Sequence, residues 1–161
     1  MPADMMHGIE AGERRQLAED IAVEAIAAAH EGLDVDAAGN HKYLGYVISV
    51  GDLRLYHSGD CVPYPGLEQL LAGKQIDVAF LPINGRDAYR LSRGVPGNFT
   101  LDEAIALCRA TEIGHLVGHH WGMFDFNTID RDLAETILRR DAGSLHWVLP
   151  EIGETYTIRR G

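Results

Sequence analysis

The chain has 161 residues, of which 46% are hydrophobic and 24% charged, values typical of a single globular domain that spans residues 1–161. Its formal net charge is −10, which argues against binding to nucleic acid or to anionic membranes, because both partners require a basic surface. The chain contains no apolar run near the ~20 residues of a membrane helix, no signal-peptide pattern and no CxxC pair among its two cysteines. We therefore expect a cytoplasmic protein with free thiols.

The first element of the chain has two interpretations. Residues 10–29 are rich in Ala, Glu, Leu and Arg, a composition that favours a helix. Between Ile21 and Ala25, however, the residues alternate, and Glu19-Asp20 could form a turn, which would give two strands instead. Residues 30–42 are rich in Gly, Asp and Asn and indicate a loop.

The remainder of the chain predicts alternating strands and helices. Gly51-Asp52 separates two β-rich runs and indicates a hairpin, and Thr100 with Glu103 forms a capping box before a helix. The predicted strands cover residues 43–50, 53–58, 76–81, 113–118, 146–149 and 155–158, the predicted helices cover 67–71, 101–111 and 128–140, and a long loop covers 81–98. This alternation favours an α/β layered domain.

Histidine and aspartate residues follow three of the predicted strands: His30 after AIAAA, Asp60 in HSGDC, and the pair His119-His120 in GHHWGMF. Ligands gather at the carboxyl ends of strands in α/β sheets, and imidazole with carboxylate suits divalent zinc, manganese or iron. Each residue also has a structural interpretation, His30 as a loop residue and Asp60 as a turn residue. Neighbouring strand residues point to opposite faces, so at most one of the two adjacent histidines faces a given site.

A second group of polar residues, Asn84-Gly85-Arg86, follows the predicted strand at 76–81. Glycine permits close approach of the backbone to a ligand, and arginine offers a planar fork for carboxylate or phosphate. Spacing alone favours the alternative, an Asn-Gly turn beside a solvent-exposed arginine.

Six segments, taken in order, resemble the metal-dependent hydrolases of the metallo-β-lactamase superfamily, in particular the branch that contains L-ascorbate-6-phosphate lactonase. They lie between about Ala22 and Asp130 and read AIAAAHEG, YLGYVISV, LYHSGDCVPYPG, IDVAFLPINGRD, GNFTLDEAIALC and GHHWGMFDFNTID. The resemblance implies an αββα sandwich. It also favours two strands, at Arg14–Ala18 and Ile21–Ala29, over the N-terminal helix, because tertiary context can override propensity.

The resemblance also implies roles for individual residues. His30, Asp60 and His120 match metal ligands, with Asp60 bridging two ions, and Asp60 and His120 are the expected catalytic residues. His120 is preferred to His119 because the family pattern runs histidine, aromatic, small or acidic residue, Met, Phe. Gly122 stands where many members of the branch have an acidic residue, so any role of that acid is absent.

Three further residues match substrate-binding positions of the family. Asn84 and Arg86 match a loop near the mouth of the active site, and Asn127 lies close to the last histidine. The implied reaction is hydrolysis of a small lactone or ester metabolite, with or without a phosphate group. A zinc or manganese ion would lower the pKa of its bound water to about 7, while Arg86, with Arg90 or Arg93, would hold the anionic group.

One family motif is missing. His-x-His-x-Asp-His supplies much of the metal site, yet the only histidine before His30 is His7. The resemblance therefore covers mainly the C-terminal half of the sandwich, and we expect a truncated domain that lacks its N-terminal part. Such a half would expose one face of its sheet, so we expect a homo-oligomer that covers it. The alternative is a longer natural protein that begins upstream of Met1 and carries the missing motif. The alternative function is an inactive homologue or a metal-binding module of the same fold.

Overall fold

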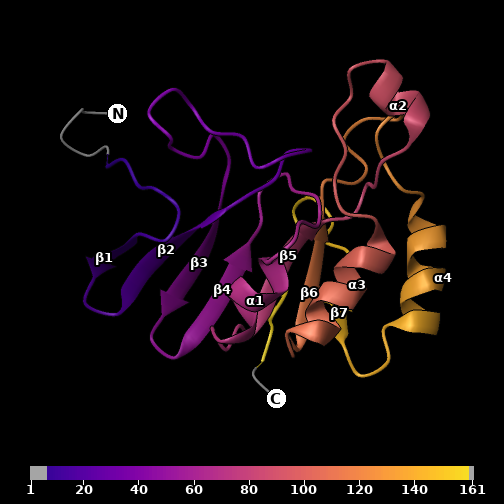
Figure 1. Ribbon diagram of the computed structural model, residues 1–161. Helices are drawn as coiled ribbons and strands as arrows, with labels where there is room; N and C mark the ends of the chain where they lie inside the picture. Colours follow the sequence, from indigo (N-terminus) through magenta and orange to yellow (C-terminus); the bar gives the residue numbers. More distant parts are fainter. Residues whose placement is uncertain (1–6, 160–161) are drawn as a thin grey trace.

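The computed structural model describes residues 7–159, which form one seven-stranded sheet with helices packed on one side (Figure 1). The strands lie in the sheet in chain order, the first four antiparallel to one another and the last four parallel. The elements are β1 (Arg14–Ala18), β2 (Ile21–Ala27), β3 (Leu44–Val50), β4 (Leu53–His57), α1 (Leu67–Ala72), β5 (Val78–Pro82), α2 (Ala88–Ser92), α3 (Leu101–Ala110), β6 (His115–His119), α4 (Arg131–Asp141) and β7 (His146–Val148).

The N-terminal stretch forms strands, as the resemblance predicted, and the helix favoured by its composition is wrong. β1 pairs with β2, and β2 pairs along all seven of its residues with β3, from Ile21 opposite Val50 to Ala27 opposite Leu44. The backbone N–H and C=O groups of β2 therefore bond to a strand on each side. A helix at this position would make none of these bonds with β1 or β3.

The capping box at the start of α3 is confirmed. The Thr100 hydroxyl accepts a bond from the Glu103 N–H at 3.3 Å, and the Glu103 carboxylate accepts one from the Thr100 N–H at 2.9 Å. α4 begins later than predicted, because Asp130 caps it by accepting a bond from the Leu133 N–H at 2.9 Å.

Two sequence predictions are wrong. Residues 155–158 are extended but pair with no strand of the described chain; Pro150, two residues beyond β7, offers no N–H to continue a ladder. The loop at 81–98 contains a short helix, α2, whose first turn is capped by Asp87 through the Arg90 N–H at 2.8 Å. That helix rises above the sheet (Figure 1).

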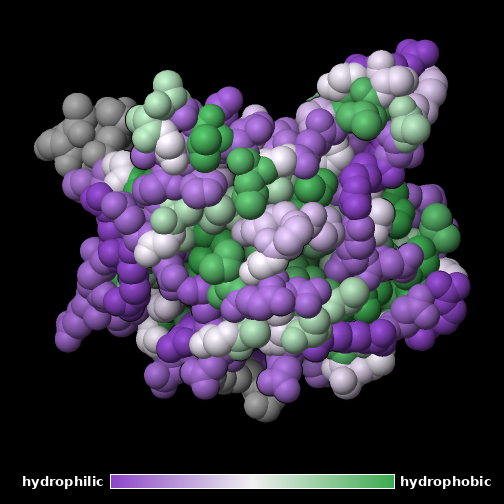
Figure 2. All heavy atoms as spheres, viewed as in Figure 1, coloured by the Kyte–Doolittle hydropathy of each residue, from purple (hydrophilic) through white to green (hydrophobic). Residues whose placement is uncertain are grey.

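The two faces of the sheet have different surroundings. On one face, Val47, Tyr56, Ala79 and Leu116 form a row across neighbouring strands and are buried beneath the helices. Hydrophilic residues cover much of the outer surface of that helical side (Figure 2). We call the opposite side the open face. Its middle consists of two adjacent register rows. One row runs from β2 to β7 through Val23, Ile48, Leu55, Val78, His115 and His146, and the next runs through Ala25, Tyr46, His57, Phe80, Val117 and Val148.

Both cysteines, Cys61 and Cys108, are buried free thiols, as expected. No helix within residues 7–159 combines the length and the apolar character needed to cross a membrane.

Candidate functional site

Asp60 and His120 lie together at the carboxyl ends of the parallel strands. Asp60 follows β4 by three residues and His120 follows β6 directly. Because β4 and β6 flank β5 and run parallel to it, their ends meet at one edge of the sheet, and Asp60 Oδ2 lies 3.3 Å from His120 Nε2. His120 has a φ of 58°, a left-handed conformation that is uncommon for a residue other than glycine and that clusters at functional sites.

Two further histidines lie beside this pair: His119, which the family pattern set aside in favour of His120, and His57, which the sequence did not single out. His57 and His119 end β4 and β6 on the open face, and their rings stack with centroids 4.7 Å apart. His57 is held in place by the Gly59 N–H, which donates to its Nδ1 at 3.0 Å. One signal was available: His57 directly precedes the SGDC segment that contains Asp60.

Burial keeps these stacked histidines neutral. Desolvation lowers the pKa of His119 to about 4, the neighbouring His57 lowers it further, and the Asp60 carboxylate opposes the shift. Desolvation also lowers the pKa of His57, and the Asp60 carboxylate again opposes this shift. Neutral imidazole is the form that binds metal ions.

Two ring nitrogens at the site have unused bonding capacity. His119 Nε2 and His120 Nδ1 are buried, and neither has a hydrogen-bond partner among residues 7–159. A buried polar atom without a partner costs about 1–3 kcal/mol, so each nitrogen would gain from a ligand or a water molecule.

His30 is near the site in its backbone but not in its side chain. Its neighbour Ala29 accepts a bond from the Val62 N–H at 2.8 Å, which joins the end of β2 to the loop that carries Asp60. The His30 ring instead lies edge-on to the ring of Tyr43, with centroids 5.0 Å apart. The structure thus brings together Asp60 and His120 without His30.

The described residues do not complete a metal site. Within residues 7–159, no three His, Cys, Asp or Glu side chains are arranged to hold one ion. Asp60 and His120 are donors that zinc and manganese accept, but catalytic zinc sites use three protein ligands. The site therefore offers two convergent donors, and the third ligand expected at His30 is turned away.

Asn84 and Asn127, two of the predicted substrate-binding residues, do meet. Asn84 Nδ2 donates to Asn127 Oδ1 at 2.8 Å, and both residues are buried, with 3% and 8% of their surface exposed. Arg90 Nη1 donates to the same Asn127 oxygen at 2.8 Å and to the Asn84 carbonyl at 2.9 Å. These bonds tie the loop after β5 to the loop after β6.

Arg86 lies elsewhere. Its two terminal nitrogens each donate to the Glu103 carboxylate at 2.6 Å, and Nη1 also donates to the Asn98 carbonyl at 3.0 Å. Gly97 makes room for this side chain, because a Cβ at position 97 would lie 2.4 Å from Arg86 Cβ. Arg86 thus holds the start of α3.

The fold is shared with several solved structures. A metallo hydrolase (Igni18) from Ignicoccus hospitalis is 21% identical with a TM-score of 0.72 and matches 95% of this chain and 60% of its own. An isothiocyanate hydrolase from Delia radicum gut bacteria is 17% identical with a TM-score of 0.68, over 92% of this chain and 58% of its own. A diiron beta-hydroxylase (CmlA) from Streptomyces venezuelae is 14% identical with a TM-score of 0.62, over 88% and 32%.

This chain therefore spans about 60% of the length of the first of these structures. The mixed α/β fold expected from the resemblance is confirmed, and the presence of both hydrolases and a hydroxylase among the neighbours means that the fold alone does not specify the reaction. No curated protein matches the sequence. Residues 2–121, which include β1 to β6 and the Asp60–His120 pair, match the Beta-lactamase superfamily domain, and the chain belongs to that family.

Proposed function

We propose that the chain contributes to the active site of a metal-dependent hydrolase. The observation that carries the proposal is the 3.3 Å approach of Asp60 Oδ2 to His120 Nε2 at the carboxyl edge of the sheet. The unpartnered nitrogens of His119 and His120 add donor capacity at the same place, and membership of the Beta-lactamase superfamily supports this chemistry.

In this proposal Asp60 and His120 hold a divalent ion, zinc or manganese, since both ions accept carboxylate and imidazole donors. His30 is the proposed third ligand, and its ring must leave Tyr43 to reach the ion. His119 remains neutral beside them, because burial keeps its pKa near 4. A neutral neighbour adds no positive charge that would repel the ion.

The proposed substrate is a small anionic metabolite, a lactone or ester with or without a phosphate group, as in the ascorbate-6-phosphate lactonase branch. Asn84 and Asn127 are the proposed contacts, and Asn84 Oδ1, buried without a partner among the described residues, is free to accept a bond from a substrate hydroxyl. Arg86 can bind the anion only by leaving Glu103. Arg93, whose guanidinium lies 4.6 Å from the Tyr89 ring centroid on exposed α2, is not held by a carboxylate in this way.

A second candidate is an inactive homologue or a metal-binding module of the same fold. The absence of a three-residue ligand group within residues 7–159 favours it, because two protein donors hold an ion less firmly than three.

Metal titration by calorimetry, followed by assays against lactones, esters and phosphodiesters, separates the candidates. We expect Asp60→Asn and His120→Gln to weaken zinc or manganese binding at least about tenfold and to abolish hydrolysis. The matched control is His146→Gln, since His146 lies on β7, which pairs with the amino-terminal half of β6. Metal binding without turnover would favour the second candidate, and undiminished binding in both variants would rule out this site.

A further inference from the structure

The open face is a largely apolar surface on which no helix of the described residues lies, although two of its residues, Val78 and Val117, are already buried, with 1% and 7% of their surface exposed. Its apolar residues form a stepped band over six strands: Val23, Ile48, Leu55 and Val78 lie in one register row on β2 to β5, and Phe80, Val117 and Val148 lie in the next row on β5 to β7. No helix within residues 7–159 packs against this band (Figure 1). Leu53 and Val50 at its lower end are 37% and 39% exposed. Contiguous apolar patches of this kind on soluble proteins usually mark an interaction surface.

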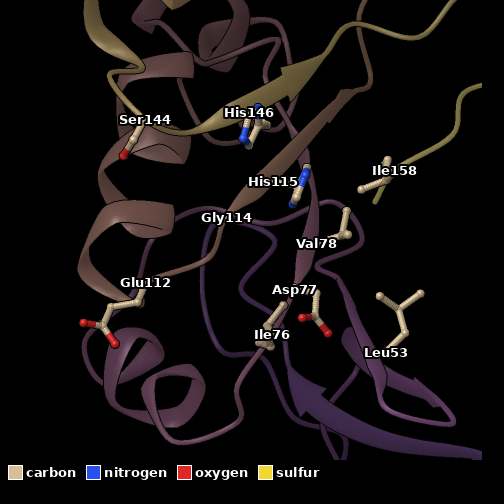
Figure 3. A pocket seen from close by; sticks show the side chains of 10 residues that line it. All are labelled: Leu53, Ile76, Asp77, Val78, Glu112, Gly114, His115, Ser144, His146 and Ile158. Atoms are coloured by element: carbon tan, nitrogen blue, oxygen red, sulfur yellow. The ribbon is translucent and has the colours of Figure 1, made fainter. Parts of the chain in front are cut away.

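Of the described residues, the C-terminal segment reaches over this face at its lower end and beside β7, where Thr157 and Ile158 line a hollow with Val148. Ile158 lies near Leu53, Val78 and His115, and together with His146 they line a pocket of about 290 Å³ (Figure 3). The pocket is a partly covered hollow between the tail and the sheet.

The strand positions of the open face carry no carboxylates, although Asp77 and Glu112 line the pocket at its lower end (Figure 3). The chain has 24 Asp and Glu residues, yet none occupies an open-face position on β2 to β7. The ionisable side chains there are four histidines: His57, His115, His119 and His146. Two copies of this strongly acidic protein can therefore bring these faces together without placing carboxylates against each other.

We infer that the open face binds a second copy of this chain, sheet against sheet. Two sheet faces pack stably about 10 Å apart, and a twofold dimer requires a surface that complements itself, which an uncharged apolar face provides. Strands about 4.8 Å apart and about 17 Å long give a flat area of roughly 500 Å² per copy. Two such faces bury about 1,000 Å², the lower limit for a specific interface.

The dimer would also close one side of the candidate site. His57 and His119 lie at the carboxyl end of the open face, with Phe80 stacked against His57 at 5.9 Å between ring centroids. A second copy seated on Phe80 excludes water from the stacked histidines, while the loops that carry Asp60 and His120 lie beyond the strand ends. The dimer does not require a bound metal ion, so it can be tested separately from the proposed hydrolase activity.

Sedimentation equilibrium of the full 161-residue chain tests this inference. We expect the wild type to be a dimer and Leu55→Glu, which places a charge in the centre of the open face, to raise the dimer dissociation constant by about a hundredfold or more. The matched control is Leu133→Glu on α4, where the side chain is 52% exposed on the helical side. That variant should dimerise like the wild type.

A second variant guards against misfolding of Leu55→Glu. Leu53→Lys lies at the exposed rim of the same face, and circular dichroism checks that each variant keeps its fold. Weakened dimerisation in either folded open-face variant, with the control unchanged, supports the inference. A wild-type monomer overturns it, as does a dimer that dissociates with Leu133→Glu but not with the open-face variants.

Discussion

Two tyrosines near the site differ in how their hydroxyl groups are bonded. Tyr56, on β4, is fully buried, and its hydroxyl has no partner within residues 7–159, whereas the Tyr64 hydroxyl donates to the Ala27 carbonyl at 2.5 Å. A buried hydroxyl without a partner costs more than a bonded one. We expect Tyr56→Phe to raise the free energy of unfolding by about 1 kcal/mol and Tyr64→Phe to lower it by about 1 kcal/mol. Urea denaturation measures both; an equal loss in the two variants would contradict the assignment.

At the same scale, the sequence predicted the proximity of Asp60 and His120 but not the role of their neighbours. Asp60 and His120 each follow a strand, so their meeting depends only on β4 and β6 being parallel. The stacking of His57 on His119 depends on register across β4, β5 and β6, and the His30 ring packs edge-on against Tyr43, which lies at the far end of the loop that follows His30. These are tertiary details that the spacing of residues in one sequence does not contain.

The start of α3 links an ion pair to a helix cap and predicts a pH dependence. Burial raises the pKa of Glu103, but the bonds from Arg86 and the Thr100 N–H outweigh it, so the net pKa is lowered. A carboxyl with a lowered folded-state pKa stabilises the fold above its unfolded pKa, near 4.3, and loses that contribution as pH falls through the folded value. We therefore expect Glu103→Gln to destabilise the protein by about 1 kcal/mol at pH 7, since both partners are partly exposed.

Denaturation at several pH values checks this sign. The difference between wild type and Glu103→Gln should shrink as the pH falls below about 4. Glu154→Gln, in the exposed C-terminal segment, serves as the control and should differ little from wild type at any pH. If the difference in the free energy of unfolding grew as the pH fell, burial and not the bonds from Arg86 and Thr100 would dominate the pKa of Glu103.

Among the elements, those with a strong local signal were predicted best. The capping box of Thr100 and Glu103 predicted the start of α3. Two β-rich runs separated by a Gly-Asp turn predicted β3 and β4. β1 and β2 required the family resemblance, because their composition favours a helix and only pairing with β3 makes them strands. α2 was missed because its five residues carry no apolar periodicity, and its Asp87 cap resembles an ordinary turn residue. Residues 155–158 have β-forming side chains but no neighbouring strand to pair with.

For the whole molecule, the sequence predicted the α/β layered fold, and within residues 7–159 the helices lie on one side of its sheet and leave the open face without one. Register explains why this face is apolar: the same alternation that aims Val47 and Tyr56 at the helices aims Ile48 and Leu55 away from them. Strands buried on both faces carry continuous apolar runs, and β5 is such a strand, with Val78 and Ala79 both buried. The composition of the central strands is therefore that of a sheet packed on two sides.

If a second copy covers the open face, folding and dimerisation are coupled and the thermal midpoint depends on protein concentration. A tenfold increase in concentration stabilises the dimer by about 1.4 kcal/mol. For two chains of 161 residues this corresponds to a rise of about 2 °C in Tm. Calorimetric scans over a hundredfold range of concentration should show this rise for the wild type and for Leu133→Glu, and none for Leu55→Glu. Tm depends on protein concentration only through the dimer interface. If Tm rose equally with concentration in all three proteins, the dimer contact would lie elsewhere on the surface.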